Sequence, residues 1–202
     1  MYRDLMPPKQ RFSPDDVIEA AFQIVRRQGW QGLSARAIAR ELKSSTRPVY
    51  DYFQSMKNIE IEVVKKALAS FVAYIGRDRT GDKWLDQAVG YVLFARNEKH
   101  LFRCINDEEH IQYQREFARQ HWLELGEQLA EDDRFKTISD EARHRIRVVR
   151  WFLLHGISYL VSNGWMDQPE PDSTNLMTDV LGMKLTDFLD KANNAIYEGF
   201  KE

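Results

Sequence analysis

The chain has 202 residues, of which 43% are hydrophobic and 30% are charged, and its formal net charge is −2. This length fits one large domain or two small ones, and the apolar content is sufficient for a core. No apolar run approaches the roughly 18 residues that a membrane span requires, and the N-terminal residues lack the apolar centre of a signal peptide. A single cysteine, Cys104, excludes an intramolecular disulfide and a zinc site built on cysteine pairs. We therefore expect a cytoplasmic protein.

Helical periodicity runs through almost the whole sequence, which contains no strand pattern, repeat or low-complexity segment. Residues 1–10 are polar and are expected to form a flexible arm. Ser13 and Pro14 then mark the start of a helix, and Gly29 marks its end. The later long helices share apolar residues at helical spacing and are expected over residues 55–76, 84–97, 98–106, 108–131, 139–164 and 173–199. The sequence therefore predicts an all-α fold.

Residues 34–53, SARAIARELKSSTRPVYDYF, are expected to form two short helices joined by a tight turn. Ser34 can cap the first helix and Ser45 the second. Val49 and Phe53 give the second helix an inward stripe at i, i+4 spacing. This is the layout of a helix-turn-helix, whose second helix enters the DNA major groove and contacts base edges from its N-terminal residues.

Basic charge is concentrated around this segment. From Arg26 to Lys57 the sequence has seven basic and two acidic residues, a local charge of +5 in a chain whose total is −2. A positive surface of this kind is attracted to the phosphates of a duplex, and the acidic remainder helps to keep the rest of the protein off it.

Residues 17–61 resemble the DNA-binding head of the tetracycline-repressor (TetR) family of transcriptional regulators. The pieces that carry the resemblance are the Ala20-Ala21 helix ending at Gly29, Leu33-Ser34 before Ile38-Ala39, and the Tyr50–Phe53 aromatic cluster leading into Lys57. The resemblance covers about the first third of the chain. It implies an N-terminal three-helix DNA-binding domain, residues 1–57, followed by a helical ligand-binding and dimerisation domain, residues 58–202.

Two positions depart from the family pattern. Lys43 stands in the turn where the family usually has glycine, so a lysine is expected to adopt a left-handed or strained conformation at a cost of about 1 kcal/mol. Met56 aligns with the phosphate-binding lysine of the family. Either Lys57, the next residue, takes over that contact from a shifted position or the contact is lost.

Arg47 and Thr46 are the predicted base contacts, because a guanidinium can pair with guanine and a threonine methyl can meet the thymine methyl. The alternative is that both contact only phosphates. Asp51 would repel phosphates, so it must face away or pair with a neighbouring base. For Tyr52, a backbone contact and core packing both stay open. The full set of predicted DNA-binding residues is Ser34, Arg36, Lys43, Ser44, Ser45, Thr46, Arg47, Pro48, Tyr50, Tyr52 and Lys57.

The second half of the chain is rich in aromatic residues that can line a pocket for an apolar or aromatic effector. Ordinary core packing is the alternative explanation for most of them. His155 either orients a ligand or satisfies a backbone carbonyl. The candidate pocket residues are Tyr91, Phe94, Phe102, Cys104, Trp122, Trp151, Phe152, His155 and Tyr159.

Gly156 and Gly182 are expected inside the last two long helices, where each costs about 1 kcal/mol relative to alanine and so suggests close helix approach. The family resemblance implies that these two helices from each of two subunits form a four-helix dimer interface. Close packing within one subunit is the alternative. The predicted interface residues are Gly156, Leu160, Leu181, Gly182, Leu185 and Phe188.

Two other functions compete with DNA binding. The sequence Glu141-x-x-His144, with Asp107-x-x-His110 as a near-copy, matches half of a di-iron carboxylate motif, but a solvated helix start explains it better. An all-helical protein-interaction module would show no steep dependence of binding on salt. The sequence thus predicts no enzyme, metal or cofactor, but a homodimeric TetR-type regulator, most simply a repressor, of a double-stranded DNA operator. Its effector is an unknown small molecule.

Overall fold

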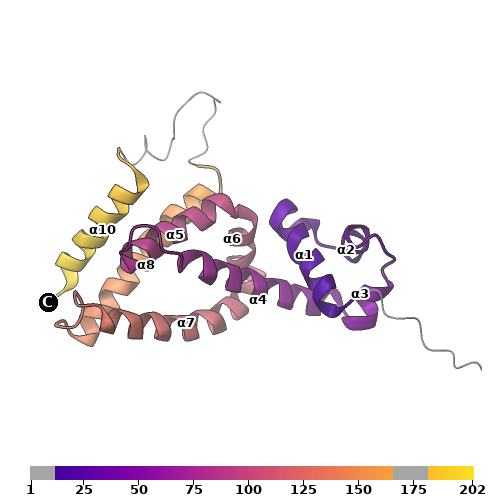
Figure 1. Cartoon of the computed structure of the whole chain (residues 1–202), viewed down its shortest axis with the longest axis horizontal. Coiled ribbons are helices and arrows are strands. Elements are labelled where there is room, and N and C mark those ends of the chain that lie inside the picture. The colour runs from indigo at the N-terminus through magenta and orange to yellow at the C-terminus, as the bar shows by residue number, and fades with distance from the viewer. Residues whose placement is uncertain (1–11, 166–181) are drawn as a thin grey trace, which may run out of the picture.

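The computed structural model describes residues 12–165 and 182–202, and every regular element within these ranges is a helix. The molecule is elongated, with a small head of three helices at one end and a larger helical body at the other (Figure 1). The elements in chain order are α1 (Pro14–Gln28), η1 (Trp30–Gly32), α2 (Ala35–Glu41), α3 (Arg47–Tyr52), α4 (Met56–Ile75), α5 (Lys83–Asn97), α6 (Lys99–Ile105), η2 (Glu108–His110), α7 (Ile111–Glu131), α8 (Asp140–Ser162) and α10 (Leu185–Phe200). The predicted all-α fold is confirmed.

Several helix ends lie where the sequence signals placed them. Ser13 and Asp16 form a capping box at the start of α1, in which the Ser13 hydroxyl accepts from the Asp16 backbone N–H and the Asp16 carboxylate accepts from the Ser13 N–H. Gly29 ends α1 with a φ of 80°, a conformation that glycine adopts without strain. Ser55 caps α4, and Gly76 follows its last residue.

The largest hydrophobic core extends from the head into the body. Ile38 and Val49 of the head pack in the same cluster as Ile59 of α4 and Leu101 of α6, and all four are fully buried. The head core therefore continues beyond residue 57 through α4. As Figure 1 shows, α4 leaves the head and passes along the body.

The helix predicted over residues 84–97 is central to the body, as its apolar circumference indicated. It is α5, which packs against α4, α6, α8 and α10. Val89 of α5, Leu154 of α8 and Leu189 of α10 share a second core. None of the helices in residues 12–165 and 182–202 is both long and apolar enough to cross a membrane.

The last helix starts later than the sequence predicted. The flexible arm of residues 1–10 lies outside the described residues, as does the first part of the helix expected over 173–199. Gly182 was expected inside that helix, and this is wrong: Gly182 has a φ of 67° and lies in a turn before α10 begins at Leu185. A positive φ is incompatible with a right-handed helix, so this glycine serves the turn and not helix packing.

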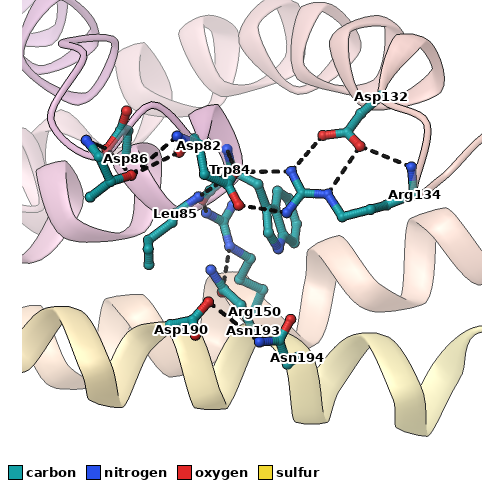
Figure 2. A network of polar contacts seen from close by, with 11 residues as sticks. Asp82, Trp84, Leu85, Asp86, Asp132, Arg134, Arg150, Asp190, Asn193 and Asn194 are labelled. Carbon is teal, nitrogen blue, oxygen red and sulfur yellow. Dashed lines mark hydrogen bonds and ion pairs between the residues drawn. The ribbon is translucent and has the colours of Figure 1, made fainter.

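A polar network fastens the far end of the body (Figure 2). Arg134, in the loop after α7, donates to the carboxylates of Asp82 and Asp132 at 2.7 and 2.6 Å. These contacts from Arg134 hold the pKa of both carboxyl groups below the usual value. Because Asp82 also caps α5, the network joins the start of α5 to the loop between α7 and α8.

The same region contains a buried arginine that pairs with no carboxylate of the described residues. Arg150 of α8 is 7% exposed, donates from Nε to the Asn193 side chain at 3.0 Å and from Nη2 to the Trp84 carbonyl, and lies 3.5 Å from the centroid of the Trp84 ring. Arg150 therefore connects α5, α8 and α10. Burial lowers the pKa of Arg150 to about 9, which still leaves the guanidinium protonated at neutral pH.

Candidate DNA interface and effector cavity

The helices α2 and α3 form the helix-turn-helix that the sequence predicted. Ser34 caps α2, with its hydroxyl accepting from the Ala37 N–H at 3.1 Å. Ile38 of α2 and Val49 of α3 are fully buried against the core of the head. The buried side of the pair fixes the two helices, and the opposite side is left free to face a duplex.

The start of α3 differs by one residue from the predicted one. Thr46, and not Ser45, occupies the N-cap position, and its side chain makes no capping hydrogen bond. The Ser45 hydroxyl instead accepts from the Arg47 N–H at 3.3 Å. Pro48 lies in the first turn of α3, where its missing N–H leaves no bond unmade.

Lys43 has a φ of 50°, and it is the one non-glycine residue with a positive φ in the described part of the chain. The predicted left-handed lysine in the turn is therefore confirmed.

We expect Lys43→Gly to raise the free energy of unfolding by about 1 kcal/mol, because glycine adopts this conformation without the clash of a Cβ. Chemical denaturation measures the change. Lys43→Ala removes the charge but keeps the clash, so an equal gain from alanine would contradict this explanation.

Arg47 projects into solvent from the first position of α3. Its side chain is 85% exposed, and its Nε lies 3.4 Å from the Asp51 carboxylate one turn later. An exposed pair at this spacing stabilises a helix by only about 0.3–0.5 kcal/mol, so Arg47 can leave Asp51 at little cost to contact a base. Asp51 thus pairs with a basic neighbour, and Tyr50, 54% exposed, lies on the same outer side.

Some of the other predicted DNA contacts are exposed, and others are half-buried and hydrogen-bonded within the head. Arg36 and Lys43 are exposed. Lys57 is also exposed and lies 3.4 Å from Glu60. Tyr52 is half-buried, and its hydroxyl donates to the Phe12 carbonyl, so in this structure it packs against the head. Ser44 is half-buried and donates to the Ser45 carbonyl at 2.9 Å.

A cavity of about 770 Å³ lies in the body between α4, α5, α7 and α8. Its volume is in the range of small-molecule sites, about 300–1,000 Å³, and its walls are mainly apolar, as in such sites. Phe71 of α4, Tyr91 of α5, Trp122 of α7 and Trp151 of α8 form part of the wall.

Three of the nine predicted pocket residues line this cavity, namely Tyr91, Trp122 and Trp151. The other six lie elsewhere. Phe94, Phe102 and Cys104 are closed into the core shared with the head, where burial raises the pKa of the Cys104 thiol to about 12 and keeps it protonated. His155 does not line the cavity but lies behind its wall, with Nδ1 3.2 Å from the hydroxyl oxygen of Tyr91. The remaining two, Phe152 and Tyr159, are on the outer side of α8.

Polar residues of the cavity wall were missed by the sequence analysis. Arg147 and Arg150 of α8 and His121 of α7 all line the cavity. The signal in the sequence was two arginines beside the apolar run of residues 151–154, but arginines at this spacing are more often on a solvated face. Their place in the wall depends on the packing of α7 against α8, which the sequence of α8 does not specify.

One side of α8 is apolar and exposed. We call the surface formed by Phe152, Gly156, Tyr159 and Leu160 the outer α8 face. Phe152 is 61% exposed and Tyr159 is 58% exposed. A Cβ added at Gly156 would meet no atom within 4 Å, so close packing within the subunit does not explain this glycine. Exposed apolar surface of this kind is typical of a protein interface.

The remaining predicted interface residues lie at the start of α10 or outside the described residues. Leu185 and Phe188 are half-buried and pack against the core that contains Leu189. Gly182 is exposed in the preceding turn. Leu181 lies outside the described residues.

The residues of the proposed metal motif make other contacts in the structure. Glu141 pairs with Arg145 at 2.8 Å, and the ring of His144 packs edge-on against Trp122. His110 is fully buried with Nδ1 2.6 Å from the Cys104 carbonyl oxygen. Within residues 12–165 and 182–202, no three His, Cys, Asp or Glu side chains are grouped so that they could hold a metal ion.

A helix-turn-helix presented by a small helical head, on a helical body, defines a DNA-binding transcriptional regulator. Residues 17–63 match the family model described as bacterial regulatory proteins, tetR family. Residues 17–63 therefore form a DNA-binding domain of the tetR type, and the protein is a DNA-binding transcriptional regulator.

Two solved structures are similar to the chain over most of its length. The fatty acid degradation regulator FadR from Bacillus halodurans has a TM-score of 0.54 and 17% identity, covering 93% of this chain and 96% of that chain. A TetR variant from Acinetobacter baumannii AYE, in complex with minocycline, has a TM-score of 0.45 and 16% identity, covering 95% of this chain and 99% of that chain. No curated protein sequence matches this chain significantly.

Proposed function

We propose that the protein is a homodimeric repressor that binds an operator through two copies of α3 and releases it when a small molecule enters the body. In this assignment residues 1–57 act as the DNA-binding domain, and residues 58–202 act as the ligand-binding and dimerisation domain. The observation that carries the proposal is the exposed side of the α2–α3 pair, from which Arg47 projects within a segment of charge +5. It acts in the cytoplasm on double-stranded DNA.

The contacts to DNA follow from the exposed residues of the head. Arg47 and Thr46 read base edges from the start of α3, and the exposed side chains of the head bind the backbone, namely Ser34, Arg36, Lys43, Ser45 and Tyr50. Lys57 supplies the phosphate contact that Met56 does not offer. It is exposed at the start of α4, and the pairing with Glu60 is weak enough to be exchanged for a phosphate.

Dimerisation is supported by the outer α8 face. A helix-turn-helix dimer reads two half-sites about 34–36 Å apart, so a second head must be held at that distance. Leu160 and Gly156 lie on the exposed apolar side of α8, and Gly156 leaves room for a partner helix to approach closely. Gly182, Leu185 and Phe188 of both subunits complete the interface.

Communication between the cavity and the head is supported by two connections. Leu68, Phe71 and Ile75 of α4 line the cavity, and α4 begins at the head. Separately, the ring of His110 lies edge-on to Trp30 of the head, with ring centroids 4.2 Å apart. Because the next residue, Ile111, lines the cavity, a ligand that displaces α7 also displaces this contact. The effector then shifts the population between two head separations.

Selection of bound sequences from random DNA tests the proposal. We expect an inverted repeat with half-site centres about 34–36 Å apart. Affinity for it should fall steeply with salt, by about 10³–10⁵ between 50 and 200 mM if 6–10 phosphates are contacted. Binding without sequence preference, or binding that is insensitive to salt, would instead favour the protein-interaction alternative.

Arg47→Ala is expected to weaken binding to the selected operator by about 1–3 kcal/mol and to relax the preference at the base that Arg47 contacts. Titrations with the operator and with single-base variants measure both effects. Arg145→Ala is the matched control, because Arg145 pairs with Glu141 on the body and not on the head. If Arg47→Ala binds every operator as the unchanged protein does, Arg47 does not read a base.

A further inference from the structure

The charged residues that line the cavity are all basic, and its other polar residues, such as Gln87, Asn106 and Gln114, are neutral. Four arginines and two histidines are part of the wall, whereas no aspartate or glutamate of the described chain lines it. The arginines of the wall are Arg115, Arg119, Arg147 and Arg150, and the histidines are His121 and His144. The whole chain has more acidic than basic residues, so this bias is a property of the cavity and not of the composition.

Arg147 is held in the wall by contacts from α7. Its Nη2 donates to the Trp122 carbonyl, and its guanidinium lies 4.2 Å from the centroid of the Trp122 ring. A Cβ at Gly126 would lie 2.6 Å from Nη1, so this glycine leaves the space that the guanidinium fills. The Nε of Arg147 is buried without an acceptor. No carboxylate of the described residues pairs with Arg147, and burial lowers its pKa.

The neighbouring basic side chains have partners to different degrees. Arg119 faces Glu116 at 3.9 Å, with both side chains mostly exposed, so this pair lies at the rim. His121 has Nδ1 3.5 Å from Glu124, but its Nε2 is buried without a partner. Arg150 has hydrogen bonds to the Asn193 side chain and the Trp84 carbonyl, neither of which neutralises its charge. Arg147 and Arg150 are therefore the arginines of the wall that are half-buried or buried and make no ion pair with a described residue.

We propose that the effector is an amphipathic anion, whose carboxylate binds at Arg147 and whose apolar body fills the aromatic part of the cavity. This assignment rests on the proposed function, because it names the ligand of the same cavity. The Nε of Arg147 is covered in this structure, so a small rotation of the side chain brings it to the ligand. Arg150 stays with Asn193 and adds attraction at a distance.

The apolar wall determines the rest of the ligand. Trp84, Trp122 and Trp151 form aromatic surfaces on three sides, and Leu68 and Leu154 add aliphatic ones. An anion without an apolar body gains no binding energy from these surfaces. An amphipathic cation is repelled by the positive charges of Arg147 and Arg150. The fit is to a monocarboxylate with a hydrocarbon chain or a fused aromatic ring.

Binding to the full-length protein without DNA tests this inference. Decanoate and 2-naphthoate are the carboxylate probes. Decanol and decyltrimethylammonium are the neutral and cationic counterparts of decanoate. Quenching of the tryptophans in the wall reports binding, and calorimetry gives the stoichiometry. We expect one carboxylate per subunit, bound at least about 10-fold more tightly than the alcohol or the ammonium compound, as a charge-assisted hydrogen bond implies.

Arg147→Gln and Arg147→Met remove the charge, and we expect each to weaken carboxylate binding by about 10–100-fold and to leave decanol binding within about 3-fold. Methionine keeps the apolar stem, so it preserves packing if glutamine lowers the melting temperature. Arg145→Gln is the matched control on the exposed side of the same helix. Equal binding of all three decyl compounds, no carboxylate binding up to about 1 mM, or unchanged carboxylate affinity in both Arg147 variants would overturn the inference.

Failure of this inference is separable from failure of the proposed function. If the protein selects an operator but prefers the ammonium compound, it is a regulator with a different class of effector. If carboxylates bind at Arg147 but no operator is selected, the ligand assignment stands and the regulatory role does not. Release of operator DNA by decanoate from the unchanged protein, and not from Arg147→Met, would support both.

Discussion

The Phe152→Asp substitution is expected to make the protein monomeric and to lower operator affinity by about 10²–10⁴, the gain that joining two half-site contacts provides. Phe152 is 61% exposed on the outer α8 face, which also contains Gly156 and Leu160. A carboxylate there would be buried against an apolar partner surface without a counter-charge, which costs several kcal/mol. Because Phe152 has few neighbours within its own subunit, the fold of the subunit should not change.

Sedimentation equilibrium measures the mass, and titration of a selected operator measures the affinity. Gln128→Asp is the control, because it adds the same charge to an exposed position of α7 outside the outer α8 face. The helical circular dichroism signal should be the same in both variants. A Phe152→Asp protein that stays dimeric and binds its operator normally would show that the subunits join through another surface.

The Arg150→Ala substitution is expected to lower the free energy of unfolding by about 3–4 kcal/mol. It leaves a cavity beside the Trp84 ring and removes donors from the Trp84 carbonyl and the Asn193 side chain, both of which Figure 2 shows around the guanidinium. For a chain of this length the change corresponds to a fall in melting temperature of roughly 6–16 °C.

Arg150→Met separates packing from hydrogen bonding. Its stem can still cover Trp84, and it removes a buried charge that has no carboxylate partner, so we expect a loss of about half that of alanine. Arg145→Ala removes a surface ion pair with Glu141 and a hydrogen bond to the Glu202 carbonyl, and should change the stability by less than about 1 kcal/mol. Equal stabilities of the Arg150→Ala and Arg145→Ala proteins would contradict a structural role for Arg150.

The DNA-binding head was largely predictable because its signals are local. The serine caps at Ser13, Ser34 and Ser55 and the glycine at the end of α1 each act within one turn of helix. The left-handed Lys43 followed from the family pattern and was confirmed. The one error in this region, Ser45 as the cap in place of Thr46, arose because two hydroxyl residues precede α3 and either can serve as a cap.

The cavity was less predictable because its wall depends on how helices far apart in the sequence face each other. Trp151 and Phe152 are neighbours on α8, yet Trp151 lines the cavity and Phe152 does not. The composition of a helix does not report that difference when both sides are apolar. Arg147 was missed for the related reason that its place in the wall depends on Trp122 and Gly126 of α7.

The single core that passes from the head through α4 to α6 limits the modularity of this protein. Ile59 and Leu101, which sit outside the expected DNA-binding segment, complete the interior on which Ile38 and Val49 rest. If the first 57 residues were exchanged for those of another regulator, the new core residues would therefore not fit against α4 and α6. The exchange would disturb a packed core and not only a linker. Operator preference and effector response are consequently expected to diverge together in this lineage, with compensating substitutions in α4 and α6.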